Sequence, residues 1–198
     1  MLPISKRIIL ASRSPRRQAL LKQIGLRFEV MESGVDEDLK DSLPPARHVE
    51  LLSLRKAEAI AGGLKEALVI GADTIVVHGD TILGKPADAA DARRMLMRLS
   101  GDEHTVYTGF TILDMPSQRT ITDHEITTVR FRSLSEAEIN EYVASGSPMD
   151  KAGAYGIQDD YGAVFVERID GCFYNVVGFP LTKFYIRLLE LHRTIGLC

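Results

Sequence analysis

Three segments of this sequence carry charged or hydroxyl side chains in patterns that suit phosphate chemistry. The first, residues 12–17 (SRSPRR), follows a short apolar run. Ser14 before Pro15 is a strong start signal for a helix, and backbone N–H groups at a helix N-terminus favour anions. The arginines add positive charge and bidentate donors. The segment therefore predicts a phosphate site, against the alternative of a well-capped helix with two solvated arginines.

The second segment places a carboxylate after an apolar run. Residues 71–74 (GADT) interrupt a strand predicted over residues 68–77. Ligands in open α/β sheets gather at strand ends, so Asp73 is a candidate general base or Mg²⁺ ligand. The alternative is a turn aspartate that bonds its own backbone.

The third segment, residues 79–85, has the G-x-x-x-x-G-K spacing of a phosphate-binding loop. That motif needs Ser or Thr next, to hold Mg²⁺. Here the next residue is Pro86, which has neither a hydroxyl nor a backbone N–H. We therefore exclude a P-loop phosphotransferase, and the pattern favours a hairpin turn at residues 78–80. Lys85 remains a candidate to bind phosphate as a point charge.

A fourth segment, residues 150–158 (DKAGAYGIQ), is rich in small residues, which let the backbone approach a ligand closely. It ends in Gln158, whose amide both donates and accepts hydrogen bonds. The alternative is a glycine-rich connection. Two charged candidates lie elsewhere: Glu37 in an acidic loop, against a solvated turn, and Lys56 on an amphipathic helix, against a surface lysine.

The bulk properties indicate one globular domain, residues 1–198. The chain is 45% hydrophobic and 26% charged, which is ordinary for such a domain. A net charge of −3 argues against nucleic acid as the main partner. The two cysteines offer neither a disulfide framework nor metal-site spacing. No signal peptide is visible and the apolar runs are too short to span a membrane, so we expect a cytoplasmic protein without a membrane partner.

Hydrophobic periodicity predicts the elements that position these segments. The predicted strands cover residues 7–11, 28–31, 68–77, 107–113, 121–131 and 163–166. The predicted helices cover residues 14–24, 46–61, 88–99, 135–143 and 180–191. Residues 32–45 read as a loop, and the strands on either side of residues 115–117 as an antiparallel pair. The pattern indicates an α/β fold with a mixed sheet flanked by helices.

Taken together, these segments resemble the Maf family of nucleotide pyrophosphatases. The matching segments follow the family's order over nearly the whole chain: residues 10–21, 35–37, 56, 71–76, 84–86, 100–109, 150–158 and 176–181. The resemblance implies a mixed twisted sheet of the Maf and Ham1-like kind, with a substrate cleft between two lobes. It also implies a homodimer.

The resemblance further implies an activity and a site. The activity is hydrolysis between the α- and β-phosphates of a nucleoside triphosphate, with Mg²⁺ or Mn²⁺ as the divalent cofactor. It places the catalytic base at Asp73 and an active-site residue at Glu37. Our working hypothesis is that Glu37 and Asp73 ligate the metal; the choice between base and ligand for Asp73 stays open. The implied substrate-binding residues are Ser12, Ser14, Arg16, Arg17, Lys56, Thr74, Lys85 and Gln158.

Three of these residues point to the nucleotide. Arg16, Thr74 and Gln158 match family members that act on dTTP and UTP, whereas a sister group for 7-methyl-GTP carries Trp, Gln and Glu. Thymine and uracil show an N3–H donor beside an O4 acceptor, and one Gln amide meets both. An amide can flip, so Gln158 by itself does not exclude cytosine. The resemblance implies a dTTP/UTP pyrophosphatase, with modified pyrimidine nucleotides as further substrates in a house-cleaning role. The alternative is a nucleotide-binding regulator of cell division without turnover, and the intact Asp73 and lysines favour the enzyme.

Overall fold

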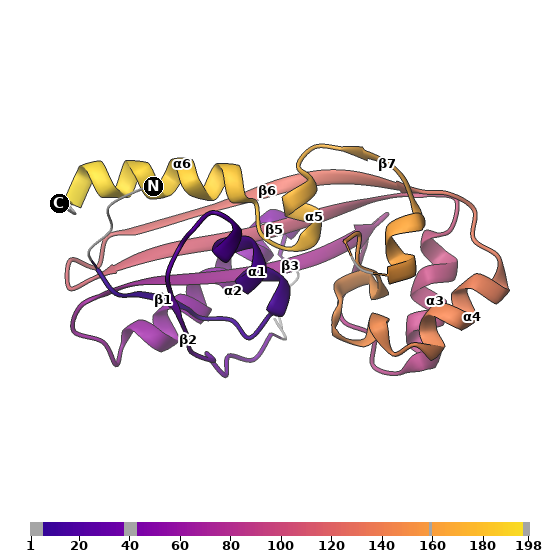
Figure 1. The fold of residues 1–198 in the computed structure, drawn as a ribbon, viewed down its shortest axis with the longest axis horizontal. Coiled ribbons are helices and arrows are strands. Elements are labelled where there is room, and N and C mark those ends of the chain that lie inside the picture. The colour runs from indigo at the N-terminus through magenta and orange to yellow at the C-terminus, as the bar shows by residue number, and fades with distance from the viewer. Residues whose placement is uncertain (1–5, 38–42, 159, 196–198) are drawn as a thin grey trace. The chain divides into compact units, whose positions relative to one another are not determined.

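The computed structural model describes residues 6–37, 43–158 and 160–195, so residues 38–42 of the predicted loop lie outside the described residues. The strands are β1 Ile8–Leu10, β2 Glu29–Val30, β3 Ala67–His78, β4 Thr81–Leu83, β5 Glu103–Met115, β6 Thr120–Phe131 and β7 Val166–Asp170 (Figure 1). The α-helices are α1 Pro15–Gln23, α2 Pro45–Ala61, α3 Ala89–Leu99, α4 Glu136–Ala144, α5 Phe173–Val177 and α6 Leu181–Ile195. Short 3₁₀ turns cover Ser147–Asp150, Ala152–Ala154 and Asp160–Val164.

The described strands form one mixed sheet in the order β2-β1-β3-β5-β6-β7, with β4 paired to β3. Strand β1 runs parallel to both β2 and β3. The pairs β3–β4 and β6–β7 are antiparallel. The predicted fold class, a mixed sheet flanked by helices, is confirmed.

The chain divides into two compact units. Unit 1 comprises Met1–Asp73, Thr108–Glu125 and Gly178–Cys198, and unit 2 comprises Thr74–Tyr107 and Ile126–Val177. Strands β3, β5 and β6 each contribute residues to both units.

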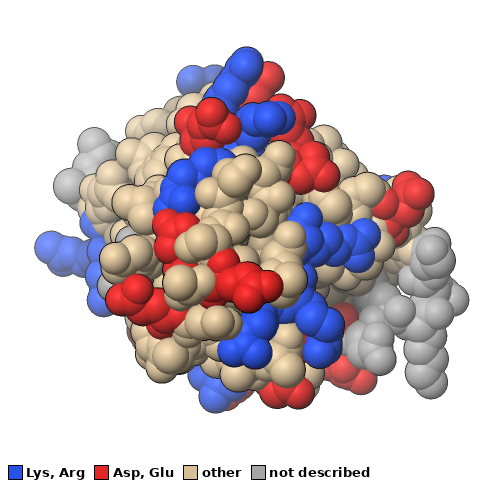
Figure 2. All heavy atoms as spheres, turned by 90° about the vertical axis from the view of Figure 1, so that its right-hand side faces the viewer, with Lys and Arg blue, Asp and Glu red and all other residues tan. Residues whose placement is uncertain are grey.

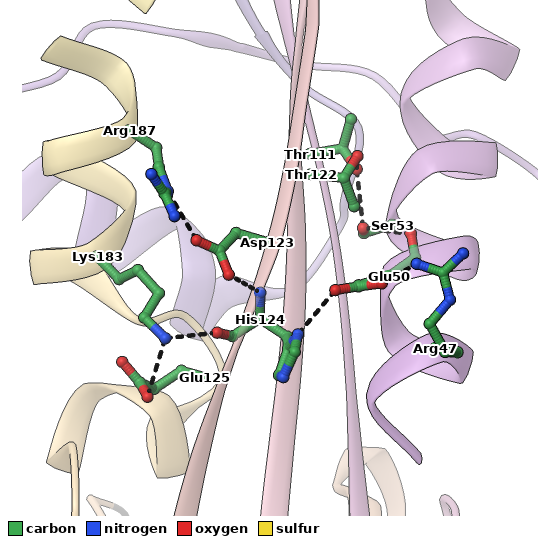
Figure 3. Close-up of polar contacts among 10 residues, drawn as sticks. All are labelled: Arg47, Glu50, Ser53, Thr111, Thr122, Asp123, His124, Glu125, Lys183 and Arg187. Atoms are coloured by element: carbon green, nitrogen blue, oxygen red, sulfur yellow. Dashed lines mark hydrogen bonds and ion pairs between the residues drawn. The ribbon is translucent and has the colours of Figure 1, made fainter. Parts of the chain in front are cut away.

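Unit 1 buries apolar side chains under α2 and under α6. The alanines Ala57 and Ala61 of α2 pack into a cluster with Ile9, Val69 and Leu113 of the strands. A second group, Phe110, Phe179 and Phe184, brings α6 onto the sheet with ring centroids 4.9–6.1 Å apart. Figures 1 and 3 show α2 and α6 on opposite faces of the strands in this unit.

Polar contacts hold the same two helices to β6. Successive side chains of a strand point to opposite faces, and the residues Asp123, His124 and Glu125 follow this rule (Figure 3). Their partners are Arg187 of α6 at 2.7 Å, Glu50 of α2 at 2.8 Å and Lys183 of α6 at 3.2 Å. The middle residue therefore contacts α2, and the outer two contact α6.

Unit 2 has an aromatic core around His104. The imidazole Nε2 lies 2.8 Å from the hydroxyl of Tyr155, and the ring packs edge-on against Phe131 at 5.0 Å. Phe165 extends this core to Tyr142 of α4. Because this environment is desolvated, burial lowers the pKa of His104 to about 4.

The helix signals in the sequence are confirmed by the caps. Ser14 precedes α1 and its side chain accepts from the Arg17 N–H. Asp88 caps α3, and Ser135 with Glu138 forms a full capping box at α4. These signals are local, so the sequence contains them completely.

Two strand predictions were wrong. β3 runs unbroken from Ala67 to His78, so residues 71–74 lie inside a strand and Asp73 is neither at a strand end nor in a turn. Residues 163–166 do not form the predicted strand; β7 begins at Val166. β7 pairs with β6 and keeps an exposed, polar pattern, so apolar periodicity could not locate it.

The surface carries mixed charge on the face that Figure 2 shows. Lysine and arginine side chains are interspersed there with aspartate and glutamate. Among the helices of the described residues, none has the length and apolar character needed to cross a bilayer.

The depressed pKa of His104 predicts acid sensitivity. The unfolded chain binds a proton near pH 6.5, whereas the folded protein binds it only near pH 4. The contribution of His104 to the free energy of unfolding is therefore fully present above pH 6.5. It is lost as the pH drops from 6.5 to 4, by about 3 kcal/mol. Urea unfolding of the wild type and of His104→Gln at pH 7.5 and pH 4.5 measures this term.

The variant should lose less stability than the wild type over that interval. Tyr155→Phe is the matched control, because it removes the hydroxyl that contacts His104 but leaves the titrating imidazole of His104 in place. Since burial is the main cause of the shift, the control should keep the wild-type pH dependence. An equal loss in His104→Gln would contradict the assignment.

Candidate active site

Three of the predicted residues meet in unit 1 at one ammonium group. Lys56 Nζ donates to Asp73 Oδ1 at 2.7 Å and to Glu37 Oε1 at 2.7 Å. The Lys56 and Asp73 side chains are only 7% and 8% exposed, whereas Glu37 is 48% exposed. A buried carboxylate is stable when a cation and hydrogen bonds compensate it, and Lys56 provides both. The surface-lysine alternative for Lys56 is therefore wrong.

Glycines in the sheet bring Lys56 within reach of Asp73. A Cβ on Gly71 of β3 would lie 2.0 Å from the Ser53 carbonyl oxygen, and one on Gly109 of β5 would lie 2.4 Å from the Val49 carbonyl oxygen. The backbone of α2 therefore rests directly on both strands. Gly71 and Asp73 are two residues apart in β3 and share a face, so this face presents Asp73 to α2.

A chain of hydroxyls fixes α2 at this position. Ser53 Oγ lies 2.9 Å from Thr111 Oγ1 of β5, which lies 2.9 Å from Thr122 Oγ1 of β6 (Figure 3). Ser53 is one helical turn before Lys56. The contacts therefore set the rotation and height of the helix that carries the ammonium.

Arg17 is the centre of a second cluster in unit 1. Its Nη1 donates to Ser12 Oγ at 3.2 Å and to the Ala72 carbonyl at 3.0 Å, and its Nε donates to the Gly178 carbonyl at 2.9 Å. Burial lowers the pKa of Arg17, while the nearby charges of Asp73 and Glu37 oppose this shift. Arg17 thus ties the segment before α1 to the residue that precedes Asp73.

The remaining residues of the SRSPRR segment lie at the start of α1. Ser12 is buried and its Oγ also accepts from the Ser14 N–H at 3.2 Å. Ser14 is occupied as the N-cap, and Arg16 lies partly buried in the first turn. The alternative of two solvated arginines is wrong for Arg17, because its guanidinium donates to internal acceptors.

The other three predicted residues belong to unit 2. Thr74 is partly buried in β3, Lys85 is exposed after β4, and Gln158 is partly buried at the end of the DKAGAYGIQ segment. The Gly153 N–H donates to the Gly84 carbonyl at 3.0 Å, so this segment is joined to the loop of Lys85. Gly153 adopts φ +69° and a Cβ there would lie 2.9 Å from Val76, which explains the need for glycine.

Glu37 and Asp73 have the chemistry to hold a divalent cation. Carboxylate oxygens suit hard cations, and Mg²⁺ is commonly bound by one or two carboxylates together with substrate phosphates. Both carboxylates converge on the same point, which Lys56 Nζ marks. Across residues 6–37, 43–158 and 160–195, no group of three or more His, Cys, Asp or Glu side chains offers a complete protein cage. The residues therefore fit a cation that the phosphates help to hold.

Comparison with known proteins decides the family. The family described as Maf-like protein matches residues 7–191. The chain belongs to the Maf family. The predicted resemblance is thereby confirmed, and the GADT, GKP and DKAGAYGIQ segments discussed above all lie inside the matched range.

The curated Maf relatives share a name. The "dTTP/UTP pyrophosphatase" of Pelotomaculum thermopropionicum is 53% identical over 178 residues, covering 90% of this chain and 93% of the relative. The protein of the same name from Salinibacter ruber is 51% identical over 185 residues, covering 93% and 91%. A solved structure, the Ham1 protein of Staphylococcus aureus, superposes with a TM-score of 0.43 at 16% identity over 64% and 72% of the chains. That likeness is too slight to carry an argument.

The sequence did not predict the backbone groups that position the charged side chains of the Maf site. Gly109 and the carbonyls of Ala72 and Gly178 position Lys56 and Arg17. Gly109 and Gly178 lie in segments that resemble the family, which was the available signal. Every residue has a backbone carbonyl, so the sequence does not indicate which carbonyls accept a hydrogen bond from Arg17.

Gly109→Ala tests the close packing of α2. The new Cβ would meet backbone atoms, which cannot rotate away, so α2 must shift and carry Lys56 with it. We expect the variant to fold with a free energy of unfolding lower by about 1–3 kcal/mol. Its kcat should fall because Lys56 is displaced. Thermal unfolding and steady-state kinetics measure both.

Gly62→Ala is the matched control, because its Cβ would lie 3.7 Å from the nearest atom at the end of the same helix, with helical backbone angles. Wild-type stability and kcat are expected there. Normal kcat in Gly109→Ala would contradict the positioning of Lys56 by this contact.

Proposed function

We propose that this chain is a nucleoside triphosphate pyrophosphatase that hydrolyses dTTP and UTP to the monophosphate and pyrophosphate. The observation that carries the proposal is the Asp73–Lys56–Glu37 cluster on a chain of the Maf family. Relatives at 51% and 53% identity, each matched over at least 90% of this chain, are named dTTP/UTP pyrophosphatases.

Asp73 is the proposed base. Within the described residues its ion pair and hydrogen bond involve Oδ1, so Oδ2 is the atom assigned to the attacking water. The water oxygen attacks the α-phosphorus while Oδ2 accepts the water proton. The bond from the α-phosphorus to the bridging oxygen breaks, and pyrophosphate leaves with the electron pair.

Positive side chains stabilise the charge that develops on the phosphates. Lys56, Arg16 and Lys85 are assigned to phosphate oxygens, and Ser12 and Ser14 line the same segment. Arg17 holds that segment and the strand of Asp73 through its three internal acceptors. Glu37 and Asp73 would hold Mg²⁺ or Mn²⁺, which would supply positive charge to neutralise the phosphates.

Gln158, with Arg16 and Thr74, is assigned to base selection. One amide presents both an acceptor to N3–H and a donor to O4 of uracil or thymine. The segment that carries Gln158 is fixed in unit 2 by Gly153 and by the buried Tyr155. A fixed amide discriminates better than a mobile one, because a mismatched base leaves its polar atoms unpaired.

Asp73→Asn tests the base. The amide cannot accept the proton, so kcat for dTTP should fall about a hundredfold or more, with pyrophosphate as the product of the wild type. A panel of nucleoside triphosphates with Mg²⁺ and Mn²⁺, scored for pyrophosphate against orthophosphate, is the measurement. Near-normal turnover by the variant would remove Asp73 as the base.

The same panel separates the enzyme from a nucleotide-binding regulator. Binding of dTTP without turnover of any nucleotide would support the regulator. Cleavage of 7-methyl-GTP in place of dTTP and UTP would keep the chemistry and overturn the pyrimidine assignment.

Gln158→Glu tests base selection. A carboxylate cannot donate to O4 and repels it, so kcat/KM for dTTP and UTP should fall at least about tenfold. The hydrolysis of inorganic tripolyphosphate, which has no base, serves as an internal reference if the protein cleaves it. An unchanged preference among dTTP, UTP and GTP would show that Gln158 does not contact the base.

A further inference from the structure

Lys56 occupies the point at which the two candidate metal ligands converge. Its Nζ lies 2.7 Å from a carboxylate oxygen of Glu37 and 2.7 Å from one of Asp73. One ammonium thus bridges the two carboxylates that would hold a divalent cation. The side chain of Lys56 is 7% exposed, so water competes little for this position.

The bridge has a physical cause in Asp73. This carboxylate is 8% exposed, and a buried carboxylate without a neighbouring cation is strongly unfavourable. The protein without metal therefore needs a positive group of its own beside Asp73, and Lys56 is that group. An ammonium and a divalent cation repel each other, so each weakens the binding of the other to the same carboxylates.

We propose that Lys56 is an internal cation that competes with the divalent metal for Glu37 and Asp73 and moves to phosphate oxygens when the metal binds. Lys56 then lowers the metal affinity of the nucleotide-free protein and supplies its charge to the nucleotide afterwards. The inference rests on the metal site of the proposed function, and it does not require turnover.

The exchange is confined to the lysine side chain. Helix α2 is fixed on Gly71 and Gly109 by backbone contacts and by the hydroxyl chain from Ser53, so the helix itself cannot withdraw. The four-carbon stem of lysine is flexible, with several rotatable bonds, and carries a compact charge. Lysine can therefore leave the carboxylates by rotation about its own bonds while α2 remains in place.

Calorimetric titration of the nucleotide-free protein with Mn²⁺ tests the competition. Lys56→Gln removes the competing charge, so the Kd for Mn²⁺ should fall at least about tenfold, although the same variant loses turnover. Lys56→Arg keeps the charge and should bind Mn²⁺ as weakly as the wild type. Lys65→Gln, a charge-matched change at an exposed residue, should leave the Kd unchanged.

The sign of the effect decides the matter. A Kd in Lys56→Gln that equals or exceeds the wild-type value would overturn the proposal, because Lys56 would then not oppose the metal. Asp73→Asn should abolish Mn²⁺ binding in either case. If neither the wild type nor Lys56→Gln binds Mn²⁺, the proposal is also overturned.

A measurement on the wild type covers the case in which Lys56→Gln fails to fold. In protein with ¹⁵N-labelled lysine, the hydrogen-bonded Lys56 ammonium gives an NMR signal that Lys56→Arg identifies by its loss. Mg²⁺ without nucleotide should shift or remove that signal in proportion to site occupancy. A signal unchanged at saturating Mg²⁺ would overturn the proposal.

Failure of the inference is distinct from failure of the proposed function. Turnover of dTTP by the wild type with no change of Mn²⁺ affinity in Lys56→Gln would overturn the inference alone. Tighter Mn²⁺ binding in Lys56→Gln, with no turnover of any nucleotide by the wild type, would support the inference and overturn the enzyme.

Discussion

The backbone of α2 rests on the backbone of β3 and β5 at two glycines, and the site in unit 1 depends on that contact. A side chain at Gly71 or Gly109 would overlap carbonyl groups of the helix at 2.0–2.4 Å. With glycine at both positions, α2 lies close enough for Lys56 to reach Asp73 across the interface. The buried carboxylate in turn needs the ammonium, because a lone charge at that depth is unfavourable. Close packing and charge compensation therefore require each other.

Internal hydrogen bonds hold the segments that carry the site residues within each unit. Arg17 binds Ser12 and the carbonyls of Ala72 and Gly178, which joins the start of α1, the strand of Asp73 and the turn before α6. In unit 2, the bond from Gly153 to Gly84 and the buried His104–Tyr155 pair hold the segments of Lys85 and Gln158. This support suits catalysis, in which charge must be oriented before the reaction rather than during it.

The errors in the strand predictions have a common origin. GADT resembles a break because glycine and aspartate are rare inside strands, yet β3 continues through it since α2 covers Gly71 and Lys56 compensates Asp73. β7 was placed too early because its own residues are polar and exposed, and its hydrogen bonds come from β6. In both cases a partner distant in the sequence outweighs the local pattern. The helix caps at Ser14, Asp88 and Ser135 involve only neighbours, so the helix starts predicted at these three residues are confirmed.

The sequence by itself determined helices α1, α2, α3, α4 and α6, the exclusion of a P-loop at Pro86, the α/β class and, through the order of its motifs, the resemblance to the Maf family. It did not predict the short helix α5. The sequence also named Glu37, Lys56 and Asp73 as candidates, but as three separate residues, each with a non-functional alternative. Only the tertiary structure decided that one ammonium joins the two carboxylates and that Arg17 faces inward. The reason is physical: periodicity and capping depend on neighbours along the chain. The ion pairs of Lys56 join residues 17 and 19 positions apart, so they depend on how closely a helix packs on a sheet. Two acceptors of Arg17 are backbone carbonyls, which every residue has, so the sequence cannot indicate them.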